Sequence, residues 1–260
     1  MTEFEAAGLG AVQGLTEFLP VSSSGHLVIF QALLGVRDEG LRFEVTVHLA
    51  TLASVLIFYR RRVWVLLRGL CAGEREAAVY AGKLGLASLP AVLLVLAVGD
   101  VLERQFEVPA VTGICLWVTG AALWSTRRTA QRASLEAPGW GAAFWIGCAQ
   151  AVAILPGVSR SGATVAAALA LGVRPVAAAE FSFLMSVIAI SGATLRVLPE
   201  LAGMPAAALQ PLWLGAGVAM LFGVAAIALF VRLLQGGSLY RFAYYTWSVG
   251  ALFLVWLWLY

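Results

Sequence analysis

Charged residues are scarce in this chain. Only 12% of its 260 residues are Asp, Glu, Lys or Arg, whereas 61% are hydrophobic and the mean hydropathy is +0.90. A soluble domain usually carries about twice that share of charge, so water cannot be the main solvent of this chain. The composition excludes an ordinary soluble domain and indicates an integral membrane protein.

Cysteines are few, and an amino-terminal basic region is lacking. Cys71, Cys115 and Cys148 are odd in number and widely separated, so they predict neither a disulfide framework nor a thiolate metal site. The amino-terminal MTEFEAAGLG has acids where a signal peptide has basic residues, and no cleavage is expected. The net charge of +3 comes from short loops beside apolar segments, which is typical of membrane orientation; nucleic-acid binding is not expected.

Apolar stretches recur along the whole chain. A helix that crosses the hydrocarbon needs roughly 20 mostly apolar residues. The sequence predicts about six spans, at Val45–Tyr59, Leu84–Gly99, Val108–Trp124, Val176–Leu198, Leu212–Val231 and Phe242–Leu259. We therefore expect an all-α polytopic protein with a single membrane domain over residues 1–260.

Two further apolar regions, Leu9–Leu34 and Trp140–Leu171, are interrupted near their centres by LPVSSSGH and LPGVSRSG. Proline, serine and glycine at mid-depth leave backbone groups unbonded, which is tolerated only where protein or a water-filled cavity replaces lipid. These regions are predicted to be re-entrant helix-loop-helix hairpins rather than spans.

Basic residues follow the first, third and fifth spans, which places those loops inside; they are Arg60, Arg61, Arg62, Arg68, Arg127, Arg128, Arg132, Arg232 and Arg241. The loops around Asp100–Glu107 and Glu200 are then outside. The two hairpins enter from opposite faces, and each half holds one hairpin and three spans. An odd number of spans inverts the second half, which predicts an inverted-topology repeat with halves at about 1–126 and 138–260.

A faint internal match follows the same symmetry. LPVSSSG at Leu19–Gly25 resembles LPGVSRSG at Leu155–Gly162 if Gly157 is a one-residue insertion. Gln13 and Gln150 lie at similar positions upstream. The match falls where the topology requires equivalence, so the two observations reinforce each other.

The first hairpin carries a cluster of polar groups. Gln13 and Glu17 are four residues apart and share one helical face, and a carboxylate in an apolar segment usually marks function. The hydroxyls and amides that follow are typical of a phosphate-binding helix start, or of ordinary helix caps; they belong to Ser22, Ser23, Ser24 and Gly25. His26 adds a group that exchanges protons near neutral pH.

The second hairpin adds a guanidinium in an apolar setting. Arg160 suits bidentate binding of a phosphate, although an ion pair with Glu17 is the structural alternative and could also be an enzyme's resting state. Its hydroxyl and amide neighbours are Ser159, Ser161, Gly162 and Thr164. The pooled groups predict phosphoryl chemistry. His48 and Glu180 each line the cavity or sit at an interface, and the sequence does not decide which.

A transporter is the competing hypothesis, because broken helices in inverted repeats are also its architecture. A lipid flippase is one version. Both functions would bind a diphosphate lipid, but only an enzyme needs a nucleophile and releases phosphate.

The sequence resembles the bacterial undecaprenyl pyrophosphate phosphatase family, also called the bacitracin resistance family. The resemblance lies in residues 13–17 followed by PVSSSGH, and in PGVSRSGAT; the segments FEVTVHLATLASV and EFSFLMSV also match the family. The resemblance spans the chain. It implies removal of the terminal phosphate from a polyprenyl diphosphate to regenerate the carrier lipid of peptidoglycan synthesis, in the bacterial inner membrane with a periplasmic site. The bilayer and the lipid are the expected partners, with a homodimer as a candidate assembly.

The resemblance also assigns roles. Glu17, Ser23, His26, Ser159, Arg160 and Thr164 are the expected site residues, with Ser23 or His26 as the nucleophile. Mg²⁺ or Ca²⁺ dependence is implied, with Glu17 as a metal ligand. Gln13 occupies the first position of the family's paired acidic motif, which removes one carboxylate from such a site.

Overall fold

The computed structural model describes residues 2–34, 40–201 and 206–259, and the elements that it defines there are helices. The fold is therefore all-α, as predicted. In chain order the helices are α1 Glu3–Phe18, α2 Ser23–Leu34, α3 Gly40–Phe58, α4 Arg60–Cys71, α5 Arg75–Phe106, α6 Pro109–Thr129, α7 Trp140–Val152, α8 Arg160–Ala170, α9 Pro175–Leu201, α10 Ala206–Gln235, the 3-10 turn η1 Leu239–Arg241, and α11 Phe242–Leu259.

Four helical segments among the described residues are long and apolar enough to cross a membrane: Arg75–Leu102, Pro175–Gly192, Gln210–Gln235 and Leu239–Leu259. They agree with four of the six predicted spans. The other two predicted spans coincide with α3, whose apolar part is shorter, and with α6, whose threonines, glycines and tryptophans lower its hydropathy. Both stay predictions.

Two segments predicted as loops are helical. The arginine-rich stretch after the first predicted span forms α4, and α5 extends beyond its predicted span to Arg75 and Phe106. Arg, Glu, Gln and Leu are good helix formers, so the helices continue past the apolar residues that hydropathy detects. The predicted loop after Glu200 falls on residues 202–205, which lie outside the described residues.

Both hairpin motifs interrupt helices, as predicted. Residues 19–22 separate α1 from α2, and residues 153–159 separate α7 from α8. Ser22 has a φ of 69° and Gly157 a φ of 94°. Glycine adopts that conformation readily, whereas a serine there is uncommon and is held by its surroundings.

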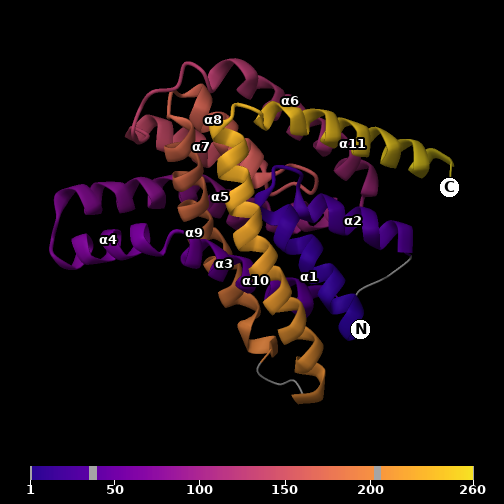
Figure 1. Cartoon of the computed structure of the whole chain (residues 1–260). Helices are drawn as coiled ribbons and strands as arrows, with labels where there is room; N and C mark the ends of the chain where they lie inside the picture. The colour runs from indigo at the N-terminus through magenta and orange to yellow at the C-terminus, as the bar shows by residue number, and fades with distance from the viewer. Residues whose placement is uncertain (1, 35–39, 202–205, 260) are drawn as a thin grey trace.

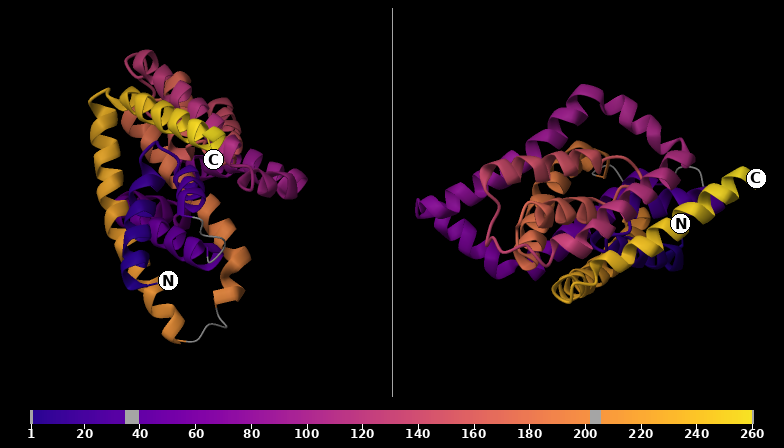
Figure 2. Two further views of the ribbon diagram at one scale, coloured as in Figure 1. Left: turned by 90° about the vertical axis from the view of Figure 1, so that its right-hand side faces the viewer. Right: turned by 90° about the horizontal axis from the view of Figure 1, so that it is seen from above.

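Each interrupted helix packs on a long helix from the other half of the chain. Helix α1 lies along α10, and α7 lies along α5 (Figure 1). Helices α6 and α11 run side by side, and α3 contacts α9 (Figure 2). The two halves are therefore interleaved rather than adjacent.

Glycines permit these close helix contacts. A Cβ on Gly10 of α1 would collide with the carbonyl oxygen of Gly215 in α10, and a Cβ on Gly147 of α7 would collide with that of Ala87 in α5. Small residues let backbones approach closely, which drives helix association in membranes. Gly10 lies three residues before Gln13, and Gly147 lies three residues before Gln150.

Replacing Gly147 with alanine is expected to destabilise the fold by about 1–3 kcal/mol, because the new methyl group overpacks the contact with α5. The measurement is the thermal unfolding midpoint of the purified, detergent-solubilised variant. Gly141→Ala is the matched control on the same helix, since a Cβ there has open space. Equal midpoints for the two variants would contradict the close contact.

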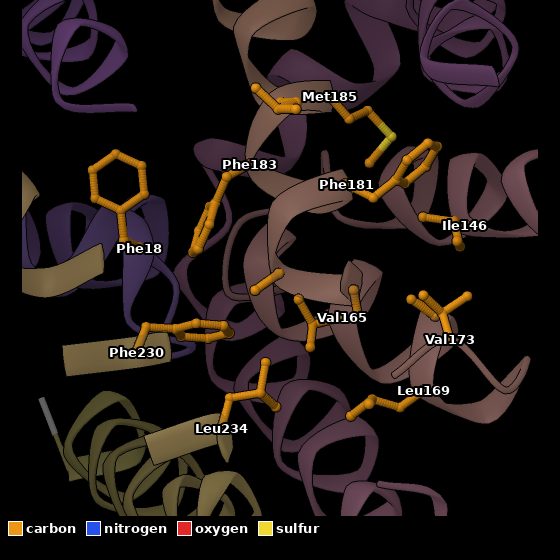
Figure 3. Packing of buried hydrophobic residues seen from close by; sticks show 14 of the residues in the cluster. Phe18, Ile146, Val165, Leu169, Val173, Phe181, Phe183, Met185, Phe230 and Leu234 are labelled. Atoms are coloured by element: carbon orange, nitrogen blue, oxygen red, sulfur yellow. The ribbon is translucent and has the colours of Figure 1, made fainter. Parts of the chain in front are cut away.

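A cluster of aromatic rings anchors the end of α1 (Figure 3). Phe18 lies 5.6 Å from Phe183 of α9 in an edge-on contact, and Phe183 lies 5.2 Å from Phe230 of α10. All three side chains are at most 2% exposed. Such edge-on pairs stabilise beyond their buried area. The cluster fixes Phe18, and with it the neighbouring Glu17.

Candidate active site

The two interrupted helices meet at their loops. A Cβ on Gly25, after the first loop, would lie 3.0 Å from the Cα of Gly157 in the second loop. A Cβ on Gly162, after the second loop, would lie 3.3 Å from the Cβ of Pro20 in the first. These crosswise contacts bring the amino-terminal ends of α2 and α8 together, as the pooled site requires.

Serines cap the two loops in the same way. The Gly25 amide donates to Ser22 Oγ at 3.2 Å, and the Gly162 amide donates to Ser159 Oγ at 3.1 Å. A second serine lies beside each cap; the pairs are Ser22 with Ser24 at 3.4 Å and Ser159 with Ser161 at 3.2 Å. The caps orient the amide-rich helix starts toward one another, and such starts favour anions.

Glu17 is the centre of the polar contacts. Its side chain is buried and forms an ion pair with Arg160 of the other hairpin. Ser23 Oγ donates to Glu17 Oε2 at 2.7 Å, and Gln13 Nε2 donates to the same oxygen at 3.0 Å. His48 Nε2 lies 3.7 Å from Glu17 Oε2. The ion pair that the sequence suggested between Glu17 and Arg160 is confirmed.

His26 faces a different partner. Its Nδ1 lies 2.8 Å from the carbonyl oxygen of Ser22, and its Nε2 lies 2.7 Å from the hydroxyl of Tyr245 in α11. The two candidate nucleophiles therefore have different partners, because Ser23 bonds to Glu17. The sequence alone did not single out Tyr245 as a neighbour of His26.

Two further hydroxyl residues hold the second loop. Thr119 of α6 donates to the Gly157 carbonyl at 2.7 Å and accepts from the Ser159 amide at 2.9 Å. Thr164 donates to the Arg160 carbonyl at 2.7 Å, and its hydroxyl lies 2.6 Å from that of Ser182 in α9. Thr164 is thus engaged with backbone and Ser182. Sequence analysis did not single out Thr119 or Ser182.

A family model described as bacitracin resistance protein BacA matches residues 6–252. The chain belongs to the BacA family. The matched residues include both loops of this BacA chain and all of the polar contacts described above.

BacA relatives of similar length carry one name, undecaprenyl-diphosphatase. The relative from Carboxydothermus hydrogenoformans is 38% identical over 260 residues, which cover 98% of this chain and 97% of the relative. The relative from Desulfosudis oleivorans is 39% identical, covering 96% and 97%, and that from Alcanivorax borkumensis is 39% identical, covering 99% and 100%. The similarity is therefore end to end.

His48 and Glu180, whose places the sequence did not decide, have different surroundings in this BacA chain. His48 lies at the site, 3.3 Å from Gln13 Nε2. Glu180 instead accepts from Arg62 at 2.8 Å and from Tyr80 at 3.3 Å, in a contact that joins α9 to α4 and α5. His48 is a site neighbour, whereas Glu180 links helices.

The donors for a metal in this BacA site are few. Among the described residues no group of three or more His, Cys, Asp or Glu side chains could hold a metal ion. Glu17 is the carboxylate at the meeting point of the loops, and the buried Gln13 Oε1 beside it has no hydrogen-bond partner. A carboxylate and an amide oxygen are ligands that Mg²⁺ and Ca²⁺ accept, but both ions need more oxygens than these two residues supply.

Proposed function

We propose that this chain is an undecaprenyl-diphosphatase, which hydrolyses undecaprenyl diphosphate to undecaprenyl phosphate and inorganic phosphate. The observation that carries the proposal is the contact of Ser23 and Arg160 with one buried carboxylate, Glu17. This contact brings together a hydroxyl, a base and a guanidinium that can bind phosphate. The chain is also similar over its whole length to relatives named undecaprenyl-diphosphatase. The product is the carrier lipid of peptidoglycan synthesis, and abundant enzyme confers bacitracin resistance.

Ser23 is the proposed nucleophile. Its Oγ is at hydrogen-bond distance, 2.7 Å, from a carboxylate that can accept its proton. Oγ attacks the terminal phosphorus, the bond from that phosphorus to the bridging oxygen breaks, and undecaprenyl phosphate leaves with the electron pair. Water then hydrolyses the phosphoserine and restores Ser23. The geometry favours Ser23 over His26, whose ring nitrogens contact Ser22 and Tyr245.

Arg160 is the proposed phosphate clamp. A guanidinium has five N–H donors. The Nη2 atom of Arg160 bonds to Glu17, so this ion pair uses only part of the donor capacity of the side chain. Charge that develops on the equatorial oxygens of the transferring phosphoryl group is stabilised by such donors. The helix starts around it would bind the remaining oxygens through Ser22, Ser24, Gly25, Ser159, Ser161 and Gly162. Thr164 contributes by holding the Arg160 backbone.

A divalent cation, Mg²⁺ or Ca²⁺, fits this site only as part of a larger oxygen set. Glu17 and the unpartnered Gln13 Oε1 would hold it, and the diphosphate oxygens would complete its coordination. When bound, such an ion neutralises phosphate charge.

The proposed architecture has six spans and two re-entrant hairpins in inverted repeats at about 1–126 and 138–260. Three paired features support it: the serine caps, the crosswise glycine contacts, and the packing of α1 on α10 and α7 on α5. The proposed location is the bacterial inner membrane with the site open to the periplasm. Under this proposal the arginines of α4 and of the end of α6 lie on the cytoplasmic side, where basic residues are usually in excess. A homodimer stays a proposal.

The test is phosphate release from undecaprenyl diphosphate by the purified, detergent-solubilised protein, with and without Mg²⁺ or Ca²⁺. Release by the wild type supports the enzyme, and dependence on the added ion supports the cation site. Folded wild type that releases no phosphate with either ion would overturn the proposal in favour of a lipid transporter, which binds the diphosphate without cleaving it.

A further inference from the structure

The hydrogen bond between His26 and Tyr245 joins residues 219 positions apart. The two rings are nearly coparallel, with 2° between their planes and 5.7 Å between their centroids. His26 is 7% exposed, whereas Tyr245 is 45% exposed. The tyrosine ring therefore lies at the edge of the fold, while its hydroxyl reaches a buried imidazole in the first loop.

The two contacts of the imidazole fix its tautomer. A carbonyl oxygen only accepts, so Nδ1 carries the hydrogen and donates to Ser22. In the neutral ring Nε2 is then the acceptor, and the Tyr245 hydroxyl donates to it. The hydrogen bond on one nitrogen determines what the other can do. Without the hydroxyl the Nε2 end of the ring loses its partner.

Helix α11 is itself held firmly against α6. Trp247 Nε1 donates to the Trp117 carbonyl at 3.1 Å, and the indole covers Gly120, where a Cβ would collide with it. Helix α6 also carries Thr119, which holds the second loop through Gly157. The α6–α11 pair thus supports both loops: α6 orients the second, and α11 reaches the first.

We propose that Tyr245 is a positioning residue for His26: its hydroxyl holds the direction of the imidazole in the first loop of the phosphate site, while the Ser22 carbonyl fixes the tautomer. This inference rests on the proposed hydrolase function. Tyr245 acts through His26 and needs no contact with the lipid. Its removal should slow catalysis rather than weaken substrate binding.

The kinetic test is Tyr245→Phe, which keeps the ring and removes only the hydroxyl. We expect kcat for phosphate release to fall on the order of 10-fold with KM unchanged, the scale seen when hydrogen-bond partners of metal-binding histidines are removed. Tyr244→Phe is the matched control: Tyr244 is 55% exposed and packs edge-on against Trp124 and Trp247. The control should retain the wild-type kcat.

A second readout does not depend on catalysis. The chain has only two histidines, so ¹⁵N-histidine labelling gives two sets of ring signals. Tyr245→Phe should shift the His26 set, and Tyr244→Phe should shift neither. An unmoved His26 signal, or an unchanged kcat despite a shifted signal, would overturn the inference. If wild type releases no phosphate, the proposed function has failed and the kinetic role fails with it, while the ring signals still show whether the contact exists.

Discussion

Phosphate release from undecaprenyl diphosphate is expected to fall about 10³-fold or more when Arg160 is replaced by alanine. A guanidinium that stabilises a transferring phosphoryl group contributes about 10³–10⁵ in kcat. Arg160 is the cation in ion-pair contact with the buried Glu17. The measurement is kcat and KM of the purified variant in detergent.

Stability must be separated from catalysis in this experiment. Removing one partner of a buried ion pair can destabilise by about 3–5 kcal/mol. Arg160→Lys keeps the charge but not the planar fork, so it should fold and still lose most activity. Arg128→Ala, at an exposed arginine near the end of α6, is the control that should keep full activity. A folded Arg160→Lys enzyme with near wild-type kcat would contradict the clamp.

Ser23→Ala is expected to remove phosphate release almost completely, by about 10⁴-fold or more, because loss of a nucleophile disables the whole catalytic unit. Rapid quenching with substrate labelled in its terminal phosphate should trap acid-stable phosphoserine on the wild type and none on the variant. Ser125→Ala, at an exposed serine of α6, is the matched control and should behave as wild type.

The same labelling experiment decides between the two candidate nucleophiles. Phosphohistidine is acid-labile, so label that appears on His26 and vanishes in acid would overturn the assignment to Ser23. Substantial turnover by a folded Ser23→Ala enzyme would do the same. Label on Ser23 together with an inactive alanine variant would establish the serine mechanism.

Much of the site could be predicted from the sequence because charged side chains cost free energy in a membrane and so stand out in apolar segments. A carboxylate and a guanidinium in apolar segments need each other, and the structure pairs Glu17 with Arg160. Tyr245, Thr119 and Ser182 could not be predicted. Serine and threonine can bond to the preceding turn of a helix, and tyrosine is common at membrane interfaces, so the presence of these residues alone does not indicate a site. Only the packing of α6, α9 and α11 brings them to the loops.

The fold, like the site, could be predicted from the sequence only in part. Apolar length located four helices that are long and apolar enough to cross a membrane, and proline with glycine located both interruptions. Hydropathy did not show that α4 is a helix or where α5 ends, because a helix boundary depends on caps and propensity rather than on apolarity. Hydropathy also does not predict which helices pack together. The packing of α1 on α10 depends on glycines, and the role of these glycines becomes evident only when the two helices are seen in contact.

That packing has a consequence for biosynthesis. Helix α1 is synthesised long before the helix that packs along it, α10, which begins at Ala206. Until α10 is made, the face of α1 with Gly10 and Gly14 lacks the helix that packs against it. A ribosome stalled before residue 206 would leave α1 without this packing partner, although Ser23, His48 and Arg160, which contact Glu17, would already have been made. The contact between α1 and α10 therefore forms only late in synthesis, after most of the chain has been made.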